Sequence, residues 1–161
     1  MIETMTDDQR SAMEKLNEFL RSPEGTAFLV EGGAGTGKTW LLGKLLSGLR
    51  PPVAVCAPTH KAINVLRRKL AVPWCIGYDA MAWDGEEVIT GTTAQLLGVA
   101  PIIADDQGME LKFGRTGRGI LDKIVPSVVI VDEVSMLGWG DFRRIRETLK
   151  RAGRKVVAVG D

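Results

Sequence analysis

The segment GGAGTGKT at residues 32–39 has the pattern of a phosphate-binding loop. It satisfies G-x-x-x-x-G-K-[ST] and lies between an apolar stretch and a segment with helical periodicity, which is the context that this motif requires. Glycines let successive backbone N–H groups curl around phosphate oxygens, and the start of the helix adds its positive dipole end. The alternative is a flexible turn that matches by coincidence. The predicted nucleotide-binding residues are Gly32, Gly33, Ala34, Gly35, Thr36, Gly37, Lys38 and Thr39.

Four side chains in two segments form a candidate catalytic set. Lys38 would reach the β- and γ-phosphates of a nucleotide, and Thr39 would offer its hydroxyl to Mg²⁺. Further along, the apolar run SVVIV ends in two adjacent carboxylates, Asp132 and Glu133. Asp132 would join the Mg²⁺ shell, and Glu133 would orient and deprotonate an attacking water, so we assign catalytic roles to Lys38 and Glu133. The alternative for the two carboxylates is a solvated acidic strand end.

The segment TDDQ at residues 6–9 has two interpretations. Thr6 followed by Gln9 is a capping box, in which each side chain satisfies a backbone N–H group at the start of a helix. The functional interpretation is that the Gln9 amide binds the edge of an adenine base. The residues alone favour neither interpretation.

The elements that must position these residues alternate between apolar runs and amphipathic segments. Continuous apolar runs are typical of strands that are buried on both faces, and their alternation with helices predicts a mostly parallel α/β sheet with helices on both sides. The predicted helices are 6–20, 38–49, 60–70 and 141–151, and the predicted strands are 26–31, 53–58, 127–132 and 155–161.

Two regions depart from this alternation. Residues 71–91 have no sustained period and are interpreted as an irregular insertion with a short strand near 88–90. Residues 100–115 indicate a β-hairpin with its turn at 105–108. The segment GRTGRG at residues 114–119, which overlaps the end of this range, is interpreted as a basic loop from its first residue. The hairpin is either a plain surface feature or a pin-like element.

Composition limits the classes of protein that remain. The 161 residues, 45% apolar and 25% charged, fit one globular domain spanning residues 1–161. A net charge of +1 means that any polyanion site must be a local patch. Cys56 and Cys75 form no CxxC pair, so neither a zinc knuckle nor a disulfide framework is indicated. This cysteine usage fits a reducing cytoplasm. The acidic N-terminus and the lack of a long apolar run predict a soluble protein without membrane contact, and we expect the chain to be a monomer.

Six motifs in this order resemble the N-terminal motor domain of superfamily 1 DNA helicases, nearest to the branch of RecD and the phage helicase Dda. They are TDDQ, GGAGTGKT, APTHKA, GTTAQLLG, VIVDEVSML and VVAVGD. The resemblance extends over nearly the whole chain except residues 71–91. The resemblance implies a RecA-like P-loop fold, ATP and Mg²⁺ as ligands, and a bacterial or phage-infected cell. It also implies ATP hydrolysis coupled to translocation on single-stranded DNA, with adenine recognition by Gln9.

The resemblance also implies which residues contact DNA. APTHKA matches the motif that holds the single-strand backbone, so Pro58, Thr59, His60 and Lys61 would face DNA. Hydroxyl, imidazole and ammonium groups are suited to phosphate contacts, although a solvated helix start is the alternative for this segment. GTTAQLLG matches a second DNA-contacting motif led by Thr92, where Ala94 replaces a residue that is often His in the family. The hairpin occupies the place of a strand-separating pin, but its DDQG tip lacks an aromatic wedge.

The segment VVAVGD is similar to the first half of a coupling motif, and the resemblance places its strand between the P-loop strand and the Asp132 strand. In relatives the motif continues into a second motor domain, which supplies an arginine finger that is worth about 10³–10⁵ in rate. We therefore expect the 161-residue chain to bind nucleotide weakly and hydrolyse it barely. Two other classes remain as alternatives: a P-loop nucleoside or small-molecule kinase, and a pseudo-enzyme that acts as an interaction domain.

Overall fold

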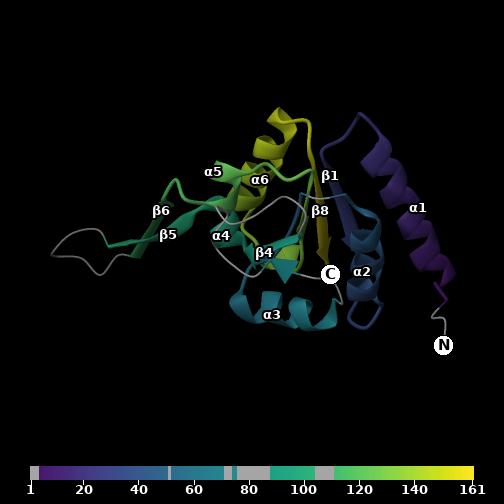
Figure 1. Ribbon diagram of the computed structural model, residues 1–161. Helices are drawn as coiled ribbons and strands as arrows, with labels where there is room; N and C mark the ends of the chain where they lie inside the picture. Colours follow the sequence, from purple (N-terminus) through teal and green to yellow (C-terminus); the bar gives the residue numbers. More distant parts are fainter. Residues whose placement is uncertain (1–3, 51, 71–73, 76–87, 104–110) are drawn as a thin grey trace.

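A computed structural model of the chain describes residues 4–50, 52–70, 74–75, 88–103 and 111–161 (Figure 1). The helices and strands predicted from periodicity are present within two residues of their predicted limits. The helices are α1 (Asp7–Arg21), α2 (Lys38–Gly48), α3 (His60–Lys69), α4 (Thr93–Leu97), α5 (Ile120–Lys123), the 3₁₀ turn η1 (Val134–Met136) and α6 (Trp139–Arg151). The strands are β1 (Ala27–Glu31), β2 (Val53–Ala57), β3 (Trp74–Cys75), β4 (Val88–Thr92), β5 (Val99–Ile103), β6 (Leu111–Arg115), β7 (Val128–Val131) and β8 (Lys155–Gly160).

The main sheet of the described residues has six parallel strands in the order β1-β8-β7-β2-β4-β3. This order confirms the predicted α/β class. It also confirms that the strand of VVAVGD lies between the P-loop strand and the Asp132 strand, since β8 pairs with β1 on one side and β7 on the other. Both neighbours bury this strand, and Val156, Val157 and Val159 are fully inaccessible to solvent.

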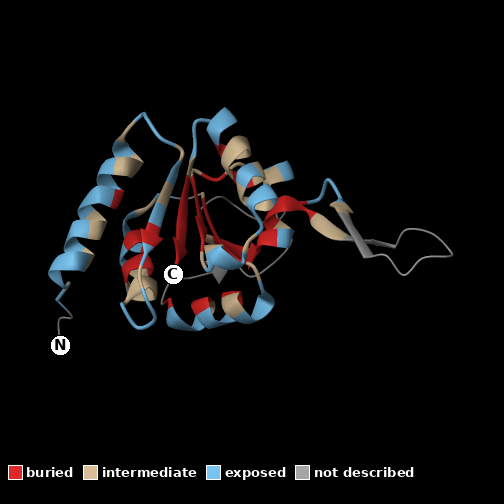
Figure 2. Ribbon diagram, turned by 180° about the vertical axis from the view of Figure 1, so that it is seen from behind, coloured by how far each residue is buried: buried red, intermediate tan, exposed pale blue. Residues whose placement is uncertain are grey.

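Helices cover the two faces of the sheet separately (Figure 1). Leu16 of α1, Leu42 of α2 and Ile63 of α3 belong to one apolar cluster, whereas Leu96 of α4 and Ile145 of α6 belong to the other. Figure 2 shows the buried strands between these layers. The connections through α2 and α3 run toward one end of the sheet and the connection through α6 runs toward the other, which places α6 on the opposite face in right-handed crossovers.

The short helices α4 and α5 were not predicted from the sequence, and strand β6 is longer than predicted. Helices α4 and α5 span five and four residues, too few for a helical period to be visible. The predicted hairpin is confirmed as β5 paired antiparallel with β6, and it projects from the body (Figure 1). The interpretation of GRTGRG as a loop from its first residue was wrong, because Gly114 and Arg115 still pair within β6. The predicted turn 105–108 and most of the insertion lie outside the described residues.

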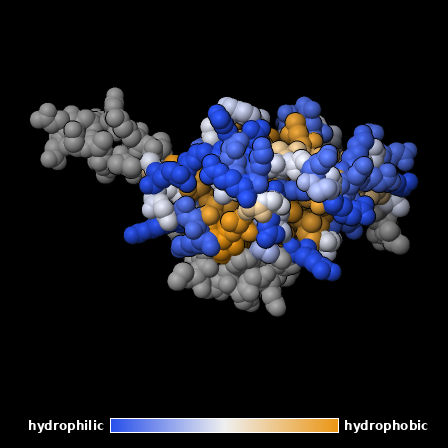
Figure 3. All heavy atoms as spheres, turned by 90° about the horizontal axis from the view of Figure 1, so that it is seen from above, coloured by the Kyte–Doolittle hydropathy of each residue, from blue (hydrophilic) through white to orange (hydrophobic). Residues whose placement is uncertain are grey.

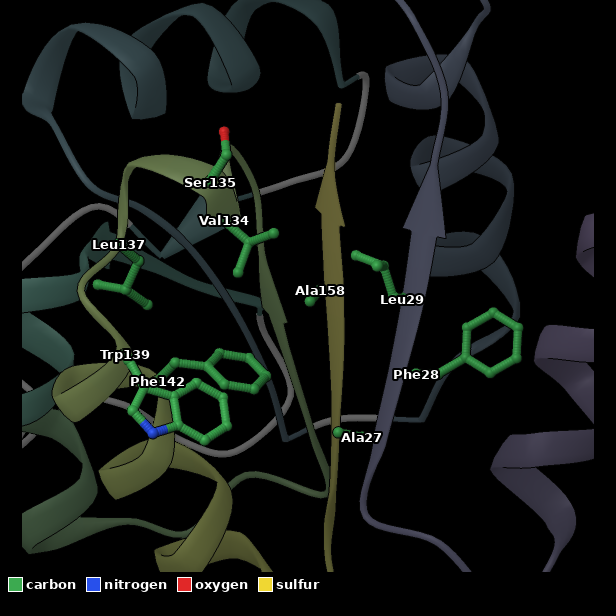
Figure 4. Close-up of a pocket in the computed structure, with 9 residues that line it drawn as sticks. All are labelled: Ala27, Phe28, Leu29, Val134, Ser135, Leu137, Trp139, Phe142 and Ala158. Atoms are coloured by element: carbon green, nitrogen blue, oxygen red, sulfur yellow. The ribbon is translucent and has the colours of Figure 1, made fainter.

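Strand β1 lies at the edge of the sheet, and its face that carries Ala27, Leu29 and Glu31 is exposed. Leu29 is 56% exposed, and with Ala27 and Ala158 it faces Trp139 and Phe142 of α6 across an apolar groove of about 410 Å³ (Figure 4). Seen from above, apolar side chains reach the surface near the middle of the molecule, whereas α1 is hydrophilic (Figure 3). None of the helices in the described ranges has the length and apolar character needed to cross a bilayer.

Candidate functional site

The P-loop follows β1 and opens α2, which confirms the strand, loop and helix context predicted for it. Two of its glycines have left-handed backbones, with φ of 75° at Gly35 and 81° at Gly37. The backbone conformation favours glycine at position 37, where a Cβ atom would also lie 2.4 Å from the Nε2 atom of Gln9 and displace that side chain. The hydroxyl of Thr36 donates to the carbonyl of Gly33 at 2.8 Å and closes the loop.

The Lys38 ammonium is held inside this loop. It donates to the carbonyls of Gly32 and Gly33, the latter at 2.8 Å, and forms an ion pair with Asp161 at 2.9 Å. The side chain of Lys38 is 19% exposed, whereas that of Asp161 is 74% exposed. An ion pair with a partner so exposed contributes little and is easily broken. Phosphate oxygens can therefore replace Asp161 and the carbonyls as the partners of this ammonium.

Asp132 lies at the end of β7, at the same edge of the sheet as the P-loop. Its backbone N–H donates to the carbonyl of Cys56 at 2.9 Å. Burial raises the pKa of its carboxyl group; a backbone hydrogen bond from Glu133 and the charges of Lys38 and Lys69 oppose this shift, and Asp161 adds to it. A cation bound at this carboxylate would favour its ionised form.

Glu133 is the only non-glycine residue with a positive φ in the described part of the chain, at φ 52° and ψ 44°. A left-handed conformation costs an ordinary residue roughly 1–2 kcal/mol, and such costs are found mostly at functional sites. The backbone carbonyl of Glu133 accepts from the N–H of Met136 at 3.0 Å, so η1 begins directly after this strained residue. The side chain of Glu133 is exposed at the cavity that also contains Lys38, Thr39 and Asp132.

This shared cavity, the nucleotide cavity, has a volume of about 280 Å³. Thr39 and Asp132 both line it, as the predicted Mg²⁺ site requires. Among the described residues, no group of three or more His, Cys, Asp or Glu side chains could hold a metal ion. One hydroxyl and one carboxylate fit Mg²⁺, because this ion keeps several waters and takes its other ligands from nucleotide phosphates.

Gln9 combines the predicted capping role with a contact to the P-loop. Its Oε1 atom accepts from the N–H of Thr6 at 3.0 Å, and its own N–H donates to the Thr6 hydroxyl at 3.2 Å, so the capping box is formed. Its Nε2 atom donates to the carbonyl of Thr36 at 3.3 Å. With Gly37 and Lys38, Gln9 lines a cavity of about 300 Å³ on the α1 side of the P-loop. Adenine recognition by Gln9 stays a prediction, and the amide lies where a nucleotide bound to this loop could reach it.

Residues of APTHKA that follow β2 line two different cavities. Thr59 caps α3, accepting from the N–H of Ala62 at 3.1 Å, and His60 is exposed in the first turn. Thr59 and Lys61 line a cavity of about 530 Å³ with Asp132 and Glu133, whereas Pro58 lines a different cavity. The motif therefore lies between the Asp132–Glu133 pair and a second surface, and its contacts with DNA stay a prediction.

Thr92 is 4% exposed and serves as the N-cap of α4. Its hydroxyl accepts from the N–H of Gln95 at 3.2 Å, while the Gln95 amide oxygen accepts from the N–H of Thr92 at 2.9 Å. The exposed residue of this turn is Ala94. A contact between the Thr92 side chain and DNA stays a prediction, and the structure gives its hydroxyl a helix-capping role instead.

Two charged residues near the catalytic set were not assigned from the sequence. Asp161 is the ion-pair partner of Lys38, and Lys69, in the last turn of α3, acts electrostatically on Asp132. A carboxylate that follows a buried strand, as Asp132 does, is a signal that also applied to Asp161. Lys69 lies among three consecutive basic residues, and periodicity does not distinguish them.

A P-loop that joins β1 to α2 in a parallel α/β sheet, with an acidic pair at the end of β7, two strands away, defines a P-loop NTPase domain. The chain belongs to the AAA domain family, whose model matches residues 4–161. This confirms the predicted RecA-like P-loop class.

The described fold is similar to that of solved helicases. A crystal structure of Pif1 helicase from Bacteroides superposes with a TM-score of 0.59 and 22% identity, over 100% of this chain and 33% of that one. A structure of Bacteroides sp. Pif1 in complex with ADP-AlF4 gives 0.56 and 24%, over 98% and 32%. An uncharacterized protein of Acanthamoeba polyphaga mimivirus is 27% identical over 159 residues, 95% of this chain and 31% of that protein. The chain thus spans about a third of the length of these proteins.

Proposed function

We propose that this chain is the ATP-binding motor domain of an ATP-dependent DNA helicase and acts with a second motor domain in a longer protein. The observation that carries the proposal is the shared cavity of Lys38, Thr39, Asp132 and Glu133 at the carboxyl edge of the sheet. The α/β fold of the chain and its likeness to Pif1 structures, one of them in complex with ADP-AlF4, support the same assignment. We further propose that the protein works in the cytoplasm of a bacterial or phage-infected cell.

Each catalytic residue has one task in this proposal. Mg·ATP would supply the metal ion and the transferable γ-phosphoryl group. The P-loop amides and Lys38 hold and neutralise the phosphates, and Thr39 and Asp132 hold the cation. Glu133 orients the attacking water and accepts its proton, and this role separates the chain from small-molecule kinases, which pass the phosphoryl group to a substrate hydroxyl.

The DNA track would cross the turns that follow β2 and β4. Pro58, Thr59, His60 and Lys61 lie at the first of these turns, and Thr92 begins the second. Parallel strands place both turns at the edge that also carries the P-loop, which is where ligands bind in open α/β sheets. In a complete motor this arrangement would allow hydrolysis to alter the grip on a single strand.

Binding of nucleotide and of single-stranded DNA, together with the rate and the product of turnover, tests this proposal on the chain itself. A fluorescent ATP analogue should bind in a Mg²⁺-dependent manner, and a fluorescent oligo-dT should bind in a salt-dependent manner. Turnover should stay well below about one per second, because the second domain would supply the arginine finger. Turnover at that rate, abolished by Glu133→Gln, would overturn the need for the second domain. Transfer of the γ-phosphoryl group to a nucleoside instead of water would replace the helicase assignment with a kinase.

A further inference from the structure

We propose that a cavity between α6 and the turns after β2 and β4 is a subsite for one backbone phosphate of single-stranded nucleic acid, bound by the guanidinium of Arg144. We call it the α6 pocket; it has a volume of about 460 Å³, and its lining includes Pro58, Thr93, Ala94, Arg115, Asp141 and Arg144. The proposal rests on the proposed function, since it adds a residue to the DNA track. Arg144 lies outside the sequence motifs that carry the family resemblance.

The Arg144 guanidinium has an unsatisfied donor. Its Nη2 atom is buried and has no hydrogen-bond partner within the described residues. Leaving a buried donor unpaired is unfavourable, and more so when the group is charged. Such groups are rare and call for an explanation, and a ligand that supplies the missing acceptor is one. The Arg144 side chain also lines the pocket, so a small turn of the guanidinium would bring this inaccessible donor to a phosphate oxygen, whose geometry the planar fork suits.

The lining of the pocket holds two cations and one carboxylate. Arg115, at the base of the β5–β6 hairpin, is the second cation, and it pairs at 3.9 Å with Asp122, which lies outside the lining. Asp141, one turn before Arg144 on α6, is the carboxylate of the lining, and no ion pair joins it to Arg144 in the described structure. Asp122 therefore balances Arg115, and an anion that enters the pocket would meet Arg144, for which the described residues supply no ion-pair partner.

The position of the pocket agrees with a nucleic-acid track. Pro58 follows β2, while Thr93 and Ala94 follow β4, so the pocket lies between the two turns that carry the predicted DNA motifs. Between these turns Arg144 would supply a charged contact, which the neutral hydroxyls of Thr59 and Thr92 cannot. Phosphate contacts of this kind position a strand without reading its sequence.

The test compares Arg144→Met with Arg143→Met, which removes the same charge from the neighbouring, exposed position on α6. Binding of fluorescent oligo-dT to the chain is followed by anisotropy across a range of salt concentrations. Arg144→Met should weaken binding roughly ten-fold, as expected for one charge-assisted hydrogen bond, and should reduce the salt slope by about 0.7. Arg143→Met should leave affinity within about two-fold and the slope nearly unchanged.

Three further outcomes have fixed meanings. Equal losses in the two variants would show general charge attraction and overturn the subsite. Loss of binding in Lys61→Ala with unchanged binding in Arg144→Met would leave the proposed function intact and remove the subsite alone. No oligo-dT binding by the unmodified chain would remove both the proposed function and the subsite.

Two controls separate the source of the phosphate and the effect on folding. Thermal stabilisation by inorganic phosphate that depends on Arg144, without any change in oligo-dT affinity, would assign the pocket to free phosphate and overturn the nucleic-acid subsite. Thermal unfolding shows whether Arg144→Met is folded. Should it fail to fold, Arg144→Lys carries the test, since it keeps the charge but loses the planar fork and should weaken oligo-dT binding several-fold.

Discussion

The carboxyl edge of the sheet has two halves whose polar groups are used differently. At the ends of β1, β7 and β8, Lys38 and Asp132 line a common cavity, and the partners of Lys38 are ones that a nucleotide could displace. At the ends of β2 and β4, the hydroxyls of Thr59 and Thr92 already cap α3 and α4. The oxygens of these hydroxyls accept in the caps while their O–H donors are not used there, so the comparison teaches that a motif residue can have a structural contact and still keep a group for a ligand.

Removing Lys38 gives the largest expected effect in the nucleotide half. Lys38→Ala removes the one lysine that lines the nucleotide cavity among the residues that the structure describes, and we expect binding of a fluorescent Mg·ATP analogue to weaken about 10- to 100-fold, as for loss of a charge-assisted interaction. Lys44→Ala is the matched control: it removes an exposed ammonium from the same helix, 5.4 Å from the Trp40 ring, and should leave binding unchanged. Equal affinities of the two variants would contradict the role of Lys38.

Removing Thr92 tests the other half through stability. Thr92→Ala deletes a buried N-cap and half of a capping box, which should lower the free energy of unfolding by about 1–2 kcal/mol. Thr59→Ala removes an exposed cap and should cost about 1 kcal/mol or less. Urea unfolding measures both. A stable Thr92→Ala variant that loses oligo-dT binding would show that Thr92 contacts DNA and not only the backbone of α4.

Gln9 has both uses in one side chain, so it sharpens the comparison. Gln9→Glu keeps an oxygen for the N–H of Thr6 but loses the Nε2 donor that reaches Thr36. We expect thermal stability to change little, while the preference for ATP over GTP falls by about ten-fold, the worth of one hydrogen bond to a base. Gln9→Ala loses both contacts and should also lose stability. Unchanged nucleotide preference in Gln9→Glu would leave Gln9 a helix cap alone.

Glu133 tests whether the nucleotide half stores backbone strain. Glu133→Gly removes the side-chain clash of the left-handed conformation, and we expect the free energy of unfolding to rise by about 1 kcal/mol. Glu133→Gln keeps the same backbone and should leave stability unchanged. Thermal unfolding of the two variants gives the measurement, and an equal rise in both would mean that the carboxylate charge, rather than the backbone, is the source of the cost.

The sequence predicted most of the fold because its long elements have clear periods. The runs that form β2, β7 and β8 are apolar throughout, and α1, α3 and α6 have one apolar face each, so burial alone determines them. Helices α4 and α5 were missed because they are shorter than two helical turns and depend on tertiary contacts between Gly98 and Gly119.

The candidate site divides along the same lines. The P-loop and the Asp132–Glu133 pair were predictable because each motif determines its own local backbone, including the glycines with positive φ. The unpaired donor of Arg144 was not predictable, because its burial depends on turns that lie far away in the sequence. Nor did the motif indicate that Thr92 would be buried, since the same hydroxyl can cap a helix or bind a phosphate.

The smallest expected effect concerns Asp132 and pH. Because burial raises the pKa of this carboxyl group in the folded chain, the folded state binds the proton more tightly than the unfolded state. Stability from this group is therefore present below the ordinary aspartate pKa and is lost as the pH rises through the raised value. Asp132→Asn should raise the melting temperature slightly at pH 7 without Mg²⁺, and the gain should vanish in acid.

Mg²⁺ and nucleotide should reverse this order, because only the ionised carboxylate can bind the cation. At pH 7 with Mg·ATP analogue, the unmodified chain should be stabilised by binding and Asp132→Asn should gain little. Thermal unfolding with and without ligand, at neutral and acidic pH, measures both signs in one experiment. A melting temperature of Asp132→Asn below that of the unmodified chain at pH 7 without ligand would mean that the buried carboxylate stabilises the fold. The nucleotide half would then resemble the other half, where polar groups are occupied by structure.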